Sequence, residues 1–279
     1  MRVGRIPYVN CYPVYGGIDR GKIPFNGLLV DGVPTKLNRM MAEGSLDISV
    51  VSAVEYARDS GRYLLLPDLA ISCDGPVRSV MLFSRMPVKD LSGKKVLVSR
   101  SSMTSVALLE LLFAERWKVA PEFVPSDAEI TDLAKFGEEE HDARLVIGDA
   151  ALLLGTRVNA VGAASYPFAY DLGEEWKAWT DLPFVFAVWV AQRNIEVDAA
   201  LAAHASLIES RNWGLNHLSE LAQQASDATG VGLAVCERYL ANLDYGLSYP
   251  HLAGLTEFFR RLVARGRVPD GQLAFLPAA

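Results

Sequence analysis

The first half of the chain alternates short apolar runs with segments of helical periodicity. Runs rich in Val, Ile, Leu and Phe are typical of buried strands, and one-sided apolar segments bounded by Pro, Ser or Gly are typical of helices. The predicted strands cover residues 2–7, 28–33, 46–51, 76–84, 94–99, 122–126, 143–149 and 185–193. The predicted helices between them cover residues 34–44, 52–61, 102–117 and 150–155. This order predicts parallel-rich sheets with helices packed on both faces.

From residue 196 onward the pattern is helical. Residues 197–226 predict one long helix or two abutting ones, and further helices are predicted at 233–243 and 252–266. Because consecutive helices do not extend a parallel sheet, we expect them to return and cover the first part of the fold.

The simplest architecture with this order is an α/β protein of two lobes. Residues 1–85 and 192–279 would form lobe 1, and residues 86–191 would form an inserted lobe 2. Two chain crossings of this kind make a hinge, and the cleft between the lobes is the expected ligand site.

The composition is that of an ordinary globular protein. Of 279 residues, 51% are apolar and 22% are charged, which is enough for a substantial core. Lysine and arginine total 27 against 33 aspartates and glutamates, a net charge of −6. No segment concentrates basic residues, so nucleic acid is not an expected partner. An anionic substrate would need local hydrogen-bond donors, because the overall field repels it.

Cysteine and histidine usage argues against disulfides and structural metals. Cys11, Cys73 and Cys236 form an odd set without a C-x-x-C pair, which fits a reducing cytoplasm. The histidines lack H-x-x-x-H spacing, so no bound metal is expected. No secretory signal is expected after Met1. The most apolar run, 182–191, is about half the length of a membrane-spanning helix, so membrane insertion is not expected.

Polar residues follow several predicted strands, at the edge where open parallel sheets bind ligands. Asn10 follows the first strand, and Ser52 and Asp149 follow or end later ones. Ser79 lies near the first crossing, and the segment SRSSMTS (99–105) follows another strand. We therefore expect these residues to converge on the cleft.

The stretch GRIPYVNCYP at residues 4–13 places Asn10 between an apolar run and Pro13. Asparagine is poor inside strands, and its amide offers both a donor and an acceptor. Two interpretations stay open: Asn10 forms a turn before Pro13, or it contacts a substrate. Cys11 is interpreted as buried packing, because no histidine lies near it in sequence to activate the thiol.

The segment 99–105 carries four serines and a threonine at a strand-to-helix turn. It has no glycine, so it is not a phosphate-binding glycine-rich loop. Its hydroxyls and the free N–H groups at the helix start suit a carboxylate. Ser102 or Thr104 is expected to cap the helix. We predict substrate binding by Ser101, Ser102, Thr104 and Ser105.

Ser52 and Asp149 each allow two interpretations. The sequence SAVE (52–55) is a capping box, in which Ser52 caps the next helix, faces the cleft, or does both, and Glu55 is structural. Asp149 either caps the following helix or supplies a carboxylate that binds a substrate hydroxyl or handles a proton. Gly148 and Ser52 complete the predicted substrate-binding residues.

Six segments together resemble the menaquinone-biosynthetic chorismate dehydratase family of the futalosine route. They are GRIPYVNCYPVY (4–15), VPTKLNRMMAEGSLDISVVSAVEY (33–56), CDGPVRSVMLFS (73–84), SRSSMTSVALLELL (99–112), LVIGDAAL (145–152) and DLGEEWKAWTDLPFVFAVW (171–189). The resemblance runs over most of the chain to about residue 193 and more loosely beyond it. The sister enzyme that makes 1,4-dihydroxy-6-naphthoate shares the fold, but it opens with a serine-, proline- and cysteine-rich strand end that this chain lacks.

The resemblance implies a type II periplasmic-binding-protein-like fold, used by a cytoplasmic enzyme. It implies a hydro-lyase that converts chorismate to 3-[(1-carboxyvinyl)oxy]benzoate and water without a cofactor or metal. By position, Asn10 and Ser79 match the family's reacting centre, while Asp149 and the Thr104/Ser105 turn match positions that line its ligand. The predicted catalytic residues are therefore Asn10, Ser79 and Asp149. The base stays open between Asp149 and a substrate carboxylate, because an asparagine amide is not basic.

Two other functions are possible beside chorismate dehydration. One is a solute-binding protein for a small carboxylate with the same fold and no catalysis, and the other is the sister enzyme. The missing secretory signal argues against the first, because transporter-linked binding proteins act outside the cytoplasm. A transcription-factor effector domain is a third interpretation, but no helix-turn-helix segment precedes it.

Overall fold

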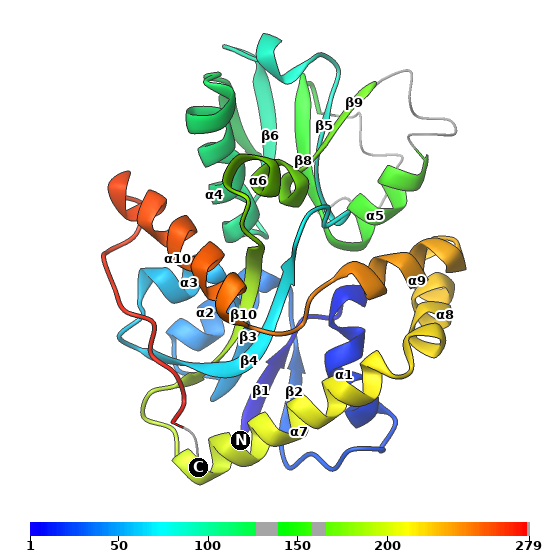
Figure 1. Cartoon of the computed structure of the whole chain (residues 1–279), viewed down its shortest axis with the longest axis vertical. Helices are drawn as coiled ribbons and strands as arrows, with labels where there is room; N and C mark the ends of the chain where they lie inside the picture. Colours follow the sequence, from blue (N-terminus) through cyan, green and yellow to red (C-terminus); the bar gives the residue numbers. More distant parts are fainter. Residues whose placement is uncertain (127–138, 158–165, 278–279) are drawn as a thin grey trace.

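The computed structural model describes residues 1–126, 139–157 and 166–277. Two five-stranded sheets form two lobes, one above the other in Figure 1, and this confirms the predicted two-lobed α/β class. Lobe 1 holds the first sheet and both ends of the chain, and lobe 2 holds the second sheet.

The sheet of lobe 1 has the strand order β2-β1-β3-β10-β4. Strand β1 pairs in parallel with β2 and β3, whereas β10 pairs antiparallel with β3 and β4. The strands are β1 (Arg2–Arg5), β2 (Leu28–Asp31), β3 (Ile48–Ser52), β4 (Tyr63–Cys73) and β10 (Phe184–Gln192).

The sheet of lobe 2 has the order β7-β6-β8-β5-β9. Strand β6 pairs in parallel with β7 and β8, whereas β5 pairs antiparallel with β8 and β9. The strands are β5 (Val80–Ser84), β6 (Lys95–Ser99), β7 (Glu122–Ser126), β8 (Ala143–Ile147) and β9 (Phe168–Asp171). Both sheets are thus mixed, and the prediction of parallel pairing holds only for part of each.

The lobe boundaries differ from the predicted ones at residues 85 and 191. Strand β5 was expected in lobe 1 but pairs within the sheet of lobe 2, and β10 was expected in lobe 2 but pairs within the sheet of lobe 1. The crossings are therefore residues 74–79 and 181–183. After each crossing, the next strand pairs antiparallel within the sheet of the other lobe. The boundaries were misplaced because a buried apolar strand has the same sequence pattern in either sheet.

Helices cover both sheets, and the predicted helix at 197–226 is two helices, α7 and α8. The α-helices are α1 (Tyr12–Asp19), α2 (Pro34–Ala42), α3 (Ala53–Arg58), α4 (Met103–Leu111), α5 (Gly148–Arg157), α6 (Leu172–Thr180), α7 (Val197–Leu215), α8 (Leu218–Thr229), α9 (Leu233–Asn242) and α10 (Tyr249–Ala264). The 3-10 helices are η1 (Val9–Cys11) and η2 (Val88–Asp90), and the π-helix η3 (Leu112–Trp117) extends α4.

The C-terminal helices cover lobe 1, as expected, but α10 also reaches lobe 2. Helix α7 packs along α1, and α10 packs against β10 and α3. The guanidinium of Arg261 in α10 pairs with Glu115 of η3 at 2.6 Å and lies 3.9 Å from the ring centroid of Trp179 in α6. Helix α10 therefore bridges the lobes.

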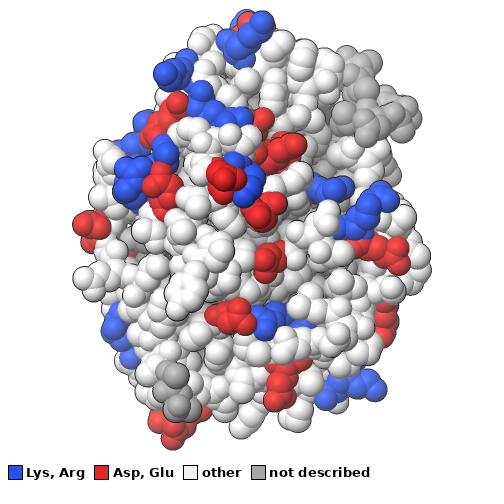
Figure 2. Space-filling model, in the orientation of Figure 1, with Lys and Arg blue, Asp and Glu red and all other residues white. Residues whose placement is uncertain are grey.

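Acidic and basic side chains are interspersed over the face of the molecule shown in Figure 2.

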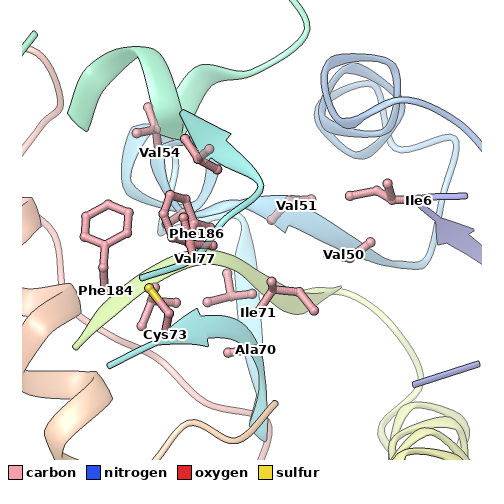
Figure 3. Packing of buried hydrophobic residues seen from close by; sticks show 14 of the residues in the cluster. Ile6, Val50, Val51, Val54, Ala70, Ile71, Cys73, Val77, Phe184 and Phe186 are labelled. Carbon is pink, nitrogen blue, oxygen red and sulfur yellow. The ribbon is translucent and has the colours of Figure 1, made fainter. Parts of the chain in front are cut away.

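The two crossings share one apolar core. Figure 3 shows Cys73 at the end of β4 and Val77 of the first crossing near Phe184 and Phe186, which follow the second crossing in β10. Phe184 also contacts Phe258 of α10, with ring centroids 4.9 Å apart. This packing holds the end of the second crossing against α10.

Gly254 of α10 allows this close packing. A methyl group at Gly254 would overlap the carbonyl oxygen of Pro183, which is backbone and cannot rotate away. We expect Gly254→Ala to lower the free energy of unfolding by about 3 kcal/mol, as other overpacked substitutions do. Gly155→Ala in α5 is the control, because its methyl group would meet no atom of the described residues within 4 Å. The control should keep or raise Tm, since alanine is the better helix former, and equal Tm values for the two variants would contradict the prediction.

Candidate active site

A cavity of about 70 Å³ lies between the lobes and collects most of the predicted site residues. Of the nine residues predicted to bind or react with substrate, seven line it, from both lobes: Asn10, Ser52, Ser79, Ser102, Thr104, Ser105 and Gly148. Ser101 and Asp149 are not among the lining residues. Polar residues at the strand ends therefore do converge on the cleft.

The remaining lining residues are mostly apolar and were not predicted. They are Ile6, Tyr8, Cys11, Pro34, Ile71, Val77, Val80, Ile147, Phe186 and Ala187. Figure 3 shows several of them around the crossings, where strands change lobes. Among the described residues that line the cavity, none is Asp, Glu, His, Lys or Arg. The polar side chains available there are hydroxyls, one amide and one thiol.

Asn10 lies in η1, which leads directly into α1, and not at the end of β1. Pro13 is in the first turn of α1, a position that suits proline, so the turn predicted at Pro13 is a helix start. The Oδ1 atom of Asn10 is buried and has no hydrogen-bond partner within the described residues. Because a buried, unpaired amide oxygen is costly, it points to a ligand as its partner.

Ser79 is buried where the first crossing enters β5. Its hydroxyl donates to the carbonyl of Val77 at the long distance of 3.4 Å, and its own carbonyl accepts from Gly148 at 2.7 Å. Arg78, just before it, has a φ of +63°, a strained value for a residue with a side chain. The carboxylate of Asp171 holds this segment by accepting the N–H groups of Val77 and Arg78 at 3.0 and 2.6 Å.

Ser52 fits both of its predicted interpretations in position, because it caps α3 and lines the cavity. Its hydroxyl accepts the N–H of Glu55 at 3.4 Å. The amide of Asn38 clamps Ser52 by donating to the hydroxyl at 2.9 Å and accepting the Ser52 N–H at 3.1 Å. Sequence reasoning missed Asn38. The available signal was an amide beside Leu37 on the buried face of α2.

Some side chains of the turn at 99–105 line the cavity, and others form hydrogen bonds with protein groups. The Ser101 hydroxyl lies 2.6 Å from that of Ser99, which explains why Ser101 does not line the cavity. Ser102 stands at the N-cap of α4, but no side chain caps that helix, so the predicted cap is wrong. Thr104 instead accepts the N–H of Val54 in lobe 1 at 3.1 Å.

Asp149 also reaches across the cleft. It is the second residue of α5, and its Oδ1 accepts the N–H of Val9 in η1 at 3.2 Å. Burial raises the pKa of this carboxyl to about 6, and the Val9 N–H opposes the rise. Asp149 thus joins lobe 2 to the segment that carries Asn10, instead of capping its own helix.

The cavity is too small for a ligand of ordinary size in this arrangement. Small-molecule sites enclose about 300–1,000 Å³, against about 70 Å³ here. The bonds Thr104–Val54 and Asp149–Val9 close the lobes over it. The lobes must separate to admit a substrate.

The described residues form neither a metal site nor a membrane-spanning helix. Within residues 1–126, 139–157 and 166–277, no three His, Cys, Asp or Glu side chains gather as a metal site would require. In the same ranges, no helix has the length and apolar content to span a bilayer.

Solved structures place the chain in a class of two-lobed proteins. A protein of Archaeoglobus fulgidus superimposes with a TM-score of 0.77 at 19% identity, covering 96% of this chain and 98% of that one. The periplasmic aliphatic sulphonate binding protein of Escherichia coli superimposes with a TM-score of 0.62 at 14% identity, covering 100% and 94%. The class defined by fold and cleft is the periplasmic-binding-protein fold.

The sequence specifies the family within this class. Residues 1–264 match the family described as menaquinone biosynthesis. The chorismate dehydratase of Thermus thermophilus is 32% identical over 278 residues, which cover 92% of this chain and 95% of that protein. The chain belongs to the menaquinone biosynthesis family.

Proposed function

We propose that this chain is a chorismate dehydratase, which converts chorismate to 3-[(1-carboxyvinyl)oxy]benzoate and water in menaquinone biosynthesis. The observation that carries the proposal is its similarity to the Thermus thermophilus enzyme over nearly the whole of both chains. The chemistry of the cavity between the lobes supports it.

The reaction is a loss of water from a ring that is one dehydration short of aromatic. A C–H bond and the C–O bond to the ring hydroxyl break, a ring double bond forms, and the proton and hydroxide leave as water. Aromatisation supplies the driving force, and no electron donor or acceptor enters the balance. The protein must bind two carboxylates, place a base at the C–H bond and assist the departing hydroxide.

The lining residues divide into two groups for this task. The hydroxyls of Ser52, Ser102 and Ser105 are neutral donors suited to the substrate carboxylates. Asn10 and Ser79 would act at the reacting centre. The Asn10 amide can orient the substrate and stabilise developing charge, since it can both donate and accept.

The geometry favours a substrate carboxylate over Asp149 as the base. Asp149 is not a lining residue, and one of its oxygens accepts the Val9 N–H. The described lining residues supply no other carboxylate or imidazole. A general base must lie within hydrogen-bond reach of its proton, and a carboxylate of the bound substrate meets this condition without a protein base.

We further propose that the enzyme works in the cytoplasm. Cys11, Cys73 and Cys236 are all free and buried, as in proteins kept in a reducing compartment.

The substrate is a small dicarboxylate, and its two charges explain why the cavity offers hydrogen-bond donors from both lobes.

The second candidate is a solute-binding protein without catalysis, which the likeness to the sulphonate binding protein favours. Purified protein should be incubated with chorismate after exhaustive chelation, and the products followed by ultraviolet absorbance and mass spectrometry. We expect an aromatic acid lighter than chorismate by one water. Tight chorismate binding without this product would favour the second candidate, and activity restored only by one metal would contradict a metal-free reaction.

A further inference from the structure

Asn38 is a buried amide in the middle of α2, where asparagine is a poor helix former. Its side chain is 3% exposed and lies on the same buried face as Leu37 and Met41. A buried polar group is costly unless it is hydrogen-bonded. Helix α2 packs against β3, which ends at Ser52 (Figure 1), and the Asn38 amide makes two hydrogen bonds to that serine.

Two backbone N–H groups determine the direction of the hydrogen bonds at Ser52. The Ser52 N–H can only donate, so the atom of Asn38 that it meets at 3.1 Å is the amide oxygen. The NH2 group of Asn38 therefore faces the Ser52 hydroxyl and donates to it at 2.9 Å. The Glu55 N–H also donates to this hydroxyl, at 3.4 Å. Ser52 Oγ is thus the acceptor in both contacts.

The Ser52 hydroxyl keeps one hydrogen-bonding function unused. A serine hydroxyl accepts two hydrogen bonds and donates one. Asn38 and Glu55 take both acceptor positions, and no group in the described part of the chain accepts the Ser52 O–H. Ser52 lines the cavity, whereas Asn38 does not. The O–H is therefore available to a ligand, and any effect of Asn38 on that ligand passes through Ser52.

We propose that Asn38 is a positioning residue that fixes Ser52 as a hydrogen-bond donor toward a ligand group that only accepts. In the proposed function this group is a carboxylate of chorismate, and the inference rests on that function for the identity of the ligand. A carboxylate has no hydrogen to offer, so a hydroxyl that turned a lone pair toward it would repel it. A hydroxyl held in the donating orientation before binding also lowers the cost of ordering it on binding.

The test is a double-mutant cycle of Asn38→Leu and Ser52→Ala. Leucine is close to asparagine in shape but neither donates nor accepts. Each substitution should raise the KM for chorismate about tenfold, the scale of one hydrogen bond to a charged group, with kcat changed less than about threefold. In the Ser52→Ala background, Asn38→Leu should change KM less than about twofold.

Ser49→Ala is the matched control for the loss of a serine hydroxyl from β3. Ser49 is fully buried, its hydroxyl donates to the Val50 carbonyl at 2.8 Å, and it does not line the cavity. This control should keep the wild-type KM.

Asn38→Asp reverses the polarity of the contact, because a carboxylate can accept the Ser52 O–H and withdraw it from the cavity. It should raise KM more than Asn38→Leu does. The excess should shrink in the Ser52→Ala background, where only the introduced charge acts. This variant also carries the cycle if the leucine variant does not fold.

A neutron structure of the wild-type protein tests the donor assignment without substrate, because it shows deuterium positions directly. We expect the Ser52 hydroxyl deuterium to point into the cavity and the Asn38 amide deuteriums to point at Ser52 Oγ and Met103 Sδ. A Ser52 deuterium directed at Asn38, or equal KM factors for Asn38→Leu in both backgrounds, would overturn the inference. If wild-type protein fails to dehydrate chorismate, the proposed function falls, and the neutron structure still decides the assignment.

Discussion

Asn10→Asp is expected to lower kcat/KM by about 100-fold or more while leaving Tm within a few degrees of wild type. The change is nearly isosteric, but it replaces a neutral amide in the cavity with a carboxylate. The new charge would repel a dianionic substrate, and it would follow Val9, whose N–H donates to the Asp149 carboxylate. A lost hydrogen bond costs about 1–3 kcal/mol and repulsion adds to it, which together correspond to at least two orders of magnitude in rate.

The pH dependence sharpens this experiment. Burial and the neighbouring charge should raise the pKa of the introduced carboxyl, and its protonated form carries no charge to repel the substrate. The deficit relative to wild type should therefore shrink as pH falls and grow as pH rises. Asn194→Asp makes the same chemical change at an exposed position and should keep wild-type kcat/KM. Turnover of Asn10→Asp close to wild type would mean that Asn10 only shapes the start of α1.

The positions of the candidate residues followed from one regularity in the sequence. Polar side chains that interrupt apolar runs mark strand ends, and the ends of strands in both lobes meet at the cleft. This regularity predicts that Asn10 and Ser52 come together, Ser79 was added because it lies near the predicted crossing, and all three line the cavity. Tyr8, which precedes η1, and Phe186 of β10 also line the cavity but were not predicted, because the sequence does not show whether an apolar or aromatic side chain faces the cavity or the core.

Single-residue distinctions within a turn lay beyond the sequence. Ser101 and Ser102 are adjacent and chemically identical, yet one bonds to Ser99 and the other lines the cavity. Backbone torsions after β6 decide this, and serine accepts many of them. Thr104 was one of two candidates to cap its own helix, but its partner is a backbone N–H fifty residues away in the other lobe. Local propensity carries no information on such long-range pairs.

The fold was predicted best where the run of apolar residues was unbroken. Strand β6 spans residues 95–99, against the predicted 94–99. Strand β4 was missed because Pro67 interrupts its pattern, and proline argues against a strand interior. The exchange of β5 and β10 between lobes has another cause. Only strand pairing distinguishes the sheets, and a buried apolar run carries no information on which strand it pairs with.

Asp149→Asn is expected to stabilise the protein near pH 7 and to keep most of its activity. The fold raises the pKa of Asp149 from 3.8 to about 6, so folding favours the protonated carboxyl. The stability that this group contributes is present in full below about pH 4 and is lost as pH rises through about 6. Asparagine carries no charge to desolvate, and its oxygen can still accept the Val9 N–H. At pH 7 the variant should gain up to about 3 kcal/mol.

The measurement is Tm between pH 4 and pH 8 for both proteins, together with kcat on chorismate at pH 7. The Tm advantage of the variant should be absent near pH 4 and should grow until about pH 7. If Asp149 only joins the lobes, kcat should stay within about tenfold of wild type. A general base contributes about 10²–10⁴-fold, so a loss on that scale with unchanged chorismate affinity would assign the proton abstraction to Asp149. The substrate carboxylate would then contribute only to binding and would not act as the base.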